Sequence, residues 1–265
     1  VSRDWSSDVC SSDLTVRNIY TGHSGYMGQI AVRLVQSGFT GERDGAATTF
    51  GEILGTQFDG NATLAGLGSE WMVADGYFKL HPTARSIQAA IDALEDLMAK
   101  AGAIDCGRIT RITVDTYRLA ASKSQKNVTG SFGAKFSIPF AAATILYHGR
   151  SSLEAFSDAA VANPSINALA QRVEISENAQ YSAAYPREQI CDLVVHLDDG
   201  STLHGRCTTT KGEPSNPVTE AELVRKFHEL GDPIWGKEVT TQLRGTLCSI
   251  DEVGDLGEMA DRFLL

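Results

Sequence analysis

Residues 83–117 read TARSIQAAIDALEDLMAKAGAIDCGRITRITVDTY, and the hydrophobic pattern changes in the middle of this stretch. In the first half, apolar side chains recur every three or four residues, which predicts an amphipathic helix over about 83–100 that ends at Gly102. In the second half, Ile112 and Val114 alternate with polar side chains, which predicts a half-buried strand over 108–117. Helical sequence therefore gives way to mixed helices and strands near Gly102.

The residues before this stretch also predict helices. Apolar positions recur at spacings of three and four over 24–38, with Ser24 as the N-cap and Gly38 as the stop. Shorter helical pieces are predicted at 47–54 and 61–67. The chain is therefore expected to be helical up to Gly102.

Helices and strands alternate after Gly102. Residues 136–147 are almost wholly apolar with Pro139 near their start, which predicts a buried helix with proline in its first turn. Residues 188–209 predict a β-hairpin that turns at 198–201. Helix starts are predicted by capping boxes at Ser151/Glu154 and Thr219/Glu222, and by Asn163 before Pro164. The helix after Thr219 is expected to end at Gly231, and two further helical segments close the chain.

Composition and charge exclude several classes of protein. Lys and Arg number 23 against 33 Asp and Glu, so the net charge of −10 disfavours nucleic acid and anionic membrane as partners. The sequence lacks an apolar run long enough to span a membrane. Its five cysteines are irregularly spaced, without CxxC and without histidine at metal-ligand spacing, so we predict a cytoplasmic protein with no metal site.

The first fourteen residues, VSRDWSSDVCSSDL, repeat Ser-Ser-Asp, lack an initiator Met and show no periodicity. They resemble translated sequencing-adapter read-through, and we interpret residues 1–14 as a non-native tail; a genuine polar tail is the alternative. The first interpretation predicts that the protein is the C-terminal part of a longer one, and that the chain is incomplete as an enzyme.

A cationic cluster directly precedes the helix predicted at 83–100. Lys79, His81 and Arg85 fall within seven residues, where free backbone N–H groups and the helix dipole also favour anions. The cluster predicts a carboxylate-binding site. The alternative is a solvated basic turn that offsets acidic neighbours.

Four blocks of the sequence resemble the MmgE/PrpD family. Residues 78–94, FKLHPTARSIQAAIDAL, resemble its K-x-x-P-x-C-R-x-x-H-x-A-I-D signature. Residues 16–22 with 38–41, residues 134–140 (AKFSIPF) and residues 212–219 (GEPSNPVT) resemble further family blocks in the same order. Each block is weak alone, and together they are specific.

This resemblance implies an α+β fold with a large all-helical domain, here partial at 15–102, and a smaller α+β lid domain at 103–218. Helices at 219–265 are expected to return to the helical domain. It also implies a lyase that needs no cofactor and dehydrates a small di- or tricarboxylate such as 2-methylcitrate. We expect a homodimer in the full-length protein.

The resemblance makes Lys79 the main catalytic candidate, as a carboxylate clamp or as a proton-transfer group, and makes Arg85 a substrate-binding residue. The family signature has Cys, His and Tyr where this chain has Ala84, Gln88 and Phe140, so the usual set of proton-carrying groups is incomplete. His81 is the candidate substitute for the missing acid/base. The alternative is a structural histidine at the helix start.

Weaker substrate-binding candidates lie elsewhere. Tyr20 and His23 precede the first predicted helix, where packing or capping is the alternative, and Lys211 lies in a loop, where simple solvation is the alternative. His196 and His204 are expected to face each other across the hairpin, with no third metal ligand nearby.

Three hypotheses follow from these residues. The first is a lyase that dehydrates a small polycarboxylate, and the second is a decarboxylase or epimerase of the same family, because all three reactions move a proton beside a carboxylate. The third is a non-catalytic carboxylate-binding subunit, which the changes at Ala84, Gln88 and Phe140 favour.

Overall fold

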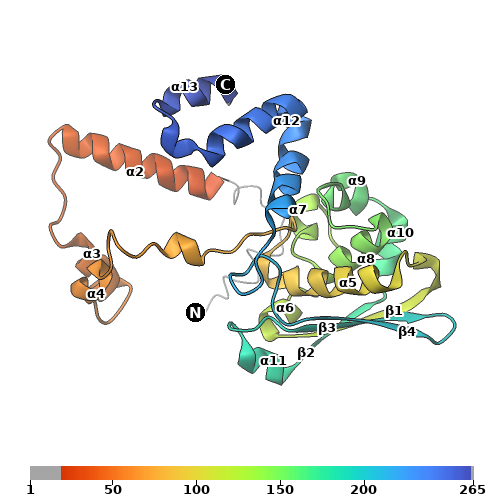
Figure 1. Ribbon diagram of the computed structural model, residues 1–265. Coiled ribbons are helices and arrows are strands. Elements are labelled where there is room, and N and C mark those ends of the chain that lie inside the picture. The colour runs from red at the N-terminus through yellow and green to blue at the C-terminus, as the bar shows by residue number, and fades with distance from the viewer. Residues whose placement is uncertain (1–18, 264–265) are drawn as a thin grey trace.

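A computed structural model describes residues 19–263 (Figure 1). Its centre is a four-stranded sheet with the order β2-β1-β3-β4, in which β1 is parallel to β2 and antiparallel to β3. The strands span Ile109–Thr116 (β1), Val173–Glu177 (β2), Cys191–Leu197 (β3) and Thr202–Cys207 (β4). The structure combines this mixed sheet with many helices, so the predicted α+β class is confirmed.

Helix α5 (Gln88–Ala101) lies against β3 and β4, and a 3-10 turn over Arg85–Ile87 leads into it. The helix buries the apolar stripe that the sequence predicts, because Ile91, Leu94 and Leu97 are fully covered. The backbone of α5 lies very close to the sheet, because a Cβ at Gly205 of β4 would collide with the carbonyl oxygen of Ala93. The N-terminal half of α5 is thus fixed relative to the end of β4.

A second group of helices completes the core. Helix α8 (Ile138–His148) is almost entirely buried and packs on α10 (Pro164–Ala170), with α5 beside it. Their starts follow the sequence predictions, because Ser137 and Asn163 accept capping hydrogen bonds and a proline follows in the first turn. The shorter helices are α6 (Arg118–Ala121), α7 (Ser131–Ala134), α9 (Asp158–Val161) and α11 (Ala179–Ala184).

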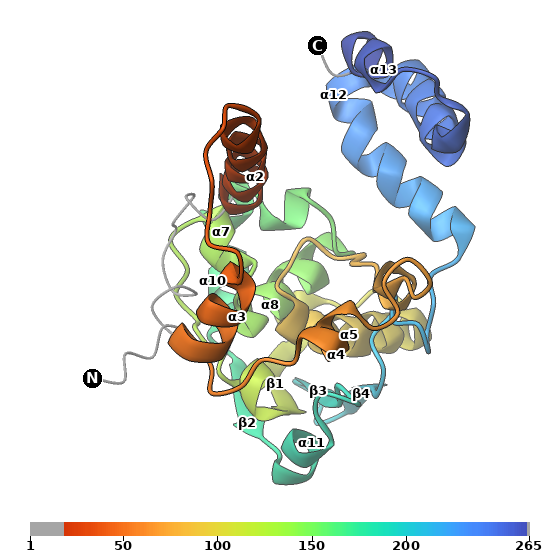
Figure 2. The ribbon, with the colours of Figure 1, turned by 90° about the vertical axis from the view of Figure 1, so that its left-hand side faces the viewer.

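The N-terminal helices stand away from the sheet (Figures 1 and 2). Helix α2 runs over Tyr20–Gln36, followed by α3 (Gly45–Ala47), a π-helical turn (Thr48–Ile53) and α4 (Gly60–Leu64). The predicted cap at Ser24 is wrong, because the helix continues through it to Tyr20. The apolar face of α2 is exposed, with Val35 67% accessible.

The C-terminal helix α12 (Glu220–Cys248) begins with the predicted capping box, in which Thr219 and Glu222 bond each other's backbone N–H. The predicted stop at Gly231 is wrong, because the helix bends at Gly236, whose φ is +78°. Gly231 is instead a contact point, since a Cβ there would collide with the Thr240 side chain across the bend. A 3-10 turn (Ile250–Glu252) and α13 (Leu256–Phe263) follow.

Two local predictions are also corrected. The capping box at Ser151/Glu154 does not form, because the turn starts later, at a 3-10 segment over Glu154–Phe156 whose Ala155 N–H is capped by Ser152. His196 and His204 do not face each other, because the register pairs them with Thr202 and Val194 respectively.

The domain boundaries at residues 102 and 218 stay predictions. The proposed non-native tail 1–14 lies outside the described residues. None of the helices within 19–263 combines the length and the apolar character that a membrane crossing requires.

Candidate active site

Segments 78–84, 134–140 and 208–216, which carry the sequence motifs, meet beside the start of α5. The Phe78 N–H donates to the Gly212 carbonyl oxygen at 3.0 Å, and the Ala84 N–H donates to the Lys135 carbonyl oxygen at 2.8 Å. Gly212 has φ +96°, and a Cβ there would collide with the Phe78 carbonyl oxygen, so this crossing needs glycine. The crossing fixes the turn that carries Lys79 and His81.

A cavity of about 680 Å³ opens next to this crossing, between α5, the end of β4, the 208–216 loop and α12. Its lining is strongly charged. Cationic side chains come from Arg150, Arg206, Lys211, Arg225 and Lys226, and carboxylates from Asp92, Glu95, Asp96, Glu222 and Glu229. The positive groups lie on β4, the 208–216 loop, α12 and the end of α8, whereas three of the acids lie on α5.

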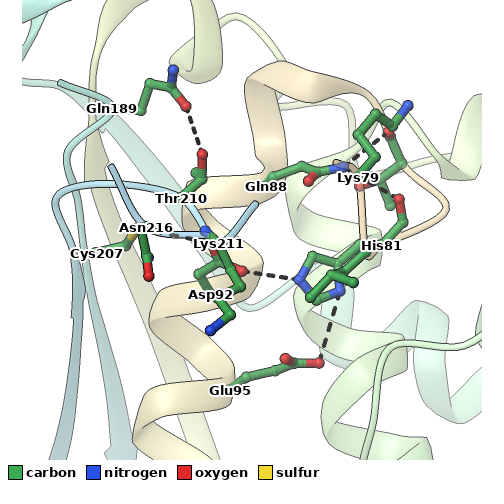
Figure 3. A network of polar contacts seen from close by, with 12 residues as sticks. Lys79, His81, Gln88, Asp92, Glu95, Gln189, Cys207, Thr210, Lys211 and Asn216 are labelled. Atoms are coloured by element: carbon green, nitrogen blue, oxygen red, sulfur yellow. Dashed lines mark hydrogen bonds and ion pairs between the residues drawn. The ribbon is translucent and has the colours of Figure 1, made fainter. Parts of the chain in front are cut away.

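His81 forms part of the wall of this cavity and is 94% buried, with a relative exposure of 6% (Figure 3). Its Nε2 lies 2.9 Å from Asp92 Oδ1, and its Nδ1 lies 3.9 Å from Glu95 Oε1. Both carboxylates come from α5, one turn apart, so the helix presents them to the two nitrogens of one ring. The structure therefore places His81 between two carboxylates at the cavity.

Asp92 also contacts residues on the opposite wall of the cavity. Its Oδ2 accepts a hydrogen bond from the Lys211 backbone N–H at 2.7 Å and lies 4.0 Å from the Cys207 sulfur. Burial, followed by the Asp92 charge, raises the pKa of Cys207 to about 12. Cys207 is thus a neutral thiol near neutral pH, which makes it a poor nucleophile.

Two of the residues that depart from the family signature are structural. Gln88 is buried, and its Nε2 donates to the carbonyl oxygens of His81 and Thr83 at 3.2 and 3.5 Å, so it fixes the His81 turn. Phe140 is fully buried and its ring packs 6.3 Å from that of Phe156 in the core. Neither residue lines the cavity.

Lys79 and Arg85 lie beside the cavity rather than in its lining. Arg85 forms an ion pair with Glu213 and stacks on the Tyr77 ring at 4.4 Å. Burial, followed by the nearby Arg85, lowers the pKa of Lys79. Lys226 of α12 donates to the carbonyl oxygens of Lys79 and Leu80, so the C-terminal helix is attached to the same turn.

The structure places the remaining candidate residues in different parts of the molecule. Lys211 lines the cavity, and its Nζ lies 3.5 Å from Glu222. Tyr20 and His23 are exposed on α2, and neither lines the cavity that contains His81. Among residues 19–263, three or more His, Cys, Asp or Glu side chains are nowhere grouped as a metal site.

Sequence reasoning missed Asp92, Glu95, Cys207 and Lys226 as site residues. For Asp92 a signal existed, because it stands at the final Asp of the family signature that residues 78–94 resemble. Cys207 and Lys226 carried no signal, because their neighbours at the site come from distant parts of the chain.

Comparison with known families identifies the family of this chain. A sequence model of the MmgE/PrpD C-terminal domain matches residues 81–247, which is more than half of the chain. The chain belongs to the MmgE/PrpD family. The MmgE/PrpD match begins at His81 and includes Arg85 and Lys211, whereas Lys79, Tyr20 and His23 precede it. A search among curated proteins found no significant match.

The raised pKa of Cys207 predicts a loss of stability at alkaline pH. Above the ordinary thiol value of 9.0 the unfolded chain loses this proton while the folded chain keeps it, so stability falls as pH rises toward the folded pKa of about 12. Between about pH 9 and 10.5 we expect this thiol to lower the unfolding free energy of the wild type by about 2 kcal/mol. Cys207→Ala lacks the thiol and should not show this part of the decrease. Urea unfolding at several pH values measures the unfolding free energy of both proteins.

Cys248→Ala is the matched control, because this thiol is exposed at the end of α12. Its stability should follow the wild-type pH profile. Parallel profiles for wild type and Cys207→Ala would contradict the prediction.

Proposed function

We propose that this MmgE/PrpD protein is a lyase that dehydrates a small polycarboxylic acid such as 2-methylcitrate. One observation carries the proposal: a buried histidine, His81, lies between two carboxylates at the wall of a cavity that also presents five cationic side chains. A proton-transfer group beside several carboxylate-binding groups is what such a dehydration requires.

The reaction removes a hydrogen next to a carboxylate and a hydroxyl group from the adjacent carbon. His81 takes the proton from carbon, the electron pair of that C–H bond forms the C=C bond, and the C–O bond breaks. The protonated His81 returns its proton to the leaving hydroxyl, which departs as water. Cations spread the negative charge that develops on the substrate carboxylate. We assign this last task to Lys211, Arg225 and Lys226, with Lys79 and Arg85 adding positive potential from behind the turn.

The distribution of acids in the lining supports one orientation of the ligand. Asp92, Glu95 and Asp96 repel carboxylates from α5, so the ligand's carboxylates bind toward α12 and β4. There, Lys211 and Arg150 form ion pairs with Glu222 and Glu229 at 3.5 Å. Such partly exposed pairs are worth about 1 kcal/mol or less, so an incoming carboxylate can displace them.

A decarboxylase or an epimerase would use the same groups, because both reactions also make or consume a carbanion beside a carboxylate. A non-catalytic carboxylate-binding subunit is the second candidate. The observation in its favour is that Gln88 and Phe140, at signature positions of proton-carrying residues, are structural here.

Calorimetric binding and turnover, both measured on the full-length protein, together test the proposal. We expect 2-methylcitrate or cis-aconitate to bind, and a double variant Arg225→Ala/Lys226→Met to weaken binding by at least about tenfold. The control is Arg118→Ala, which removes a cation that lies outside the cavity. Binding without turnover would favour the carboxylate-binding subunit, and no binding of any di- or tricarboxylate would refute both candidates.

We also propose a homodimer for the full-length protein. The exposed apolar face of α2, with Met27, Leu34 and Val35, supports a contact with a second copy. Light scattering that reports a monomer across the micromolar range would refute it.

A further inference from the structure

We propose that Asp92 is a positioning residue that fixes His81 in the tautomer with its hydrogen on Nε2, so that Nδ1 is the nitrogen that takes the substrate proton. The second half of this statement rests on the proposed function. The first half is a property of the protein alone.

Asp92 uses both of its oxygens. Oδ1 lies 2.9 Å from His81 Nε2, and Oδ2 accepts the Lys211 backbone N–H at 2.7 Å. An ionised carboxylate can only accept hydrogen bonds. The hydrogen between Asp92 and His81 therefore belongs to Nε2, and in the neutral ring Nδ1 keeps its lone pair.

The other ring nitrogen, Nδ1, makes no hydrogen bond within residues 19–263. Nδ1 lies 3.9 Å from Glu95 Oε1, which is too long for a hydrogen bond, and the Glu95 side chain is 41% exposed. Within residues 19–263 the ring has no hydrogen-bond partner other than Asp92. Nδ1 is thus the nitrogen left without a hydrogen bond in a residue that lines the cavity, and we assign it to the substrate proton.

Charged groups of several elements line the same cavity as His81. Glu95 comes from α5, Arg206 from β4, Lys211 from the following loop, and Lys226 with Glu229 from α12. These residues surround the same cavity but do not hydrogen-bond the ring. Asp92 alone is placed to select which nitrogen carries the hydrogen.

The ring and the carboxylate are both held in place from other directions. The Gln88 side chain donates a hydrogen bond to the His81 carbonyl oxygen, and α5 packs closely against β4 at Gly205. Asp92 cannot rotate freely, because the Lys211 N–H needs an acceptor at Oδ2. Its hydrogen bond to His81 is thus set by two separate parts of the fold.

The Lys211 contact makes the effect of Asp92→Asn specific. The amide oxygen must face the Lys211 N–H, so the amide NH₂ group must face His81 Nε2. An NH₂ group only donates, so Nε2 must become the acceptor and the hydrogen must move to Nδ1. The variant should therefore hold the ring in the opposite tautomer, in which Nε2 rather than Nδ1 carries the lone pair that can accept a proton.

Nitrogen-15 NMR of the histidine rings tests this directly, in the full chain without ligand and at a pH at which the ring is neutral. The His81 signal is assigned by its absence in His81→Gln. We expect the Nε2–H tautomer in the wild type and in Glu95→Gln, and the Nδ1–H tautomer in Asp92→Asn. An Nδ1–H tautomer in the wild type would overturn the proposal even if Asp92→Asn failed to fold.

Kinetics test the second half. Asp92→Asn should lower kcat by about 10²-fold or more with KM changed by less than about threefold. A switched tautomer with wild-type kcat would overturn the role of Nδ1. A full-length wild-type protein that turns over no carboxylate would refute the proposed function and this role with it, whereas the NMR result would still judge the positioning by Asp92.

Discussion

Replacing His81 by glutamine should lower kcat by about 10³-fold while changing the affinity for 2-methylcitrate by less than about threefold. Glutamine keeps a polar side chain at the wall of the cavity but cannot accept a proton from carbon at neutral pH. The cations on α12 and in the 208–216 loop, which bind the substrate carboxylates in our proposal, stay in place. Steady-state kinetics and calorimetry on the same preparation measure the two quantities.

His204→Gln is the matched control, because His204 is exposed on β4, bonds only Thr202 in the described part of the chain, and does not line the cavity. Its kinetics should equal those of the wild type. If His81→Gln retained full turnover, His81 would be a structural residue that connects α5 to the turn before it.

Phe140→Ala should lower the free energy of unfolding by about 4 kcal/mol. The Phe140 ring is completely buried and packs against Phe156, so its removal leaves a cavity inside the helical part of the core. Alanine is a good helix former and the Ser137 cap bonds the backbone at this position, so the loss comes from packing. Urea unfolding followed by circular dichroism gives the value.

The control for this loss is Phe39→Ala, because Phe39 is 64% exposed. We expect a change within about 0.5 kcal/mol there. Phe140→Tyr should also destabilise the protein, by about 1–3 kcal/mol, because the hydroxyl would enter a core of apolar neighbours. Equal stability of Phe140→Ala and wild type would show that this core is not packed as described.

Local sequence patterns were sufficient for most individual elements. The three- and four-residue spacing before Gly102, the alternation around Ile112, and proline after Ser137 or Asn163 all fix backbone conformation within a few residues. The turn at 198–201 predicted the hairpin for the same reason. These predictions depend on neighbours in the chain, and the structure confirms them.

The glycine predictions show where local reasoning stops. Gly102 does end α5, with φ +76°, as a helix stop requires. Gly231 does not end α12, because it serves a contact with Thr240 that exists only once the helix has bent at Gly236. A glycine that relieves a clash between distant segments looks the same in sequence as one that ends a helix.

The same limit applies to the site. The cationic residues at 79–85 and the loop at Lys211 stand out in the sequence, because charge and helix position are local properties. The long-range contacts of the site do not: Asp92 meets the Lys211 backbone across 119 residues, and Lys226 meets the Leu80 carbonyl oxygen across 146. These contacts arise when β4 packs on α5 and α12 returns to the turn before it, so composition and spacing place the candidate groups, and only packing selects which of them touch.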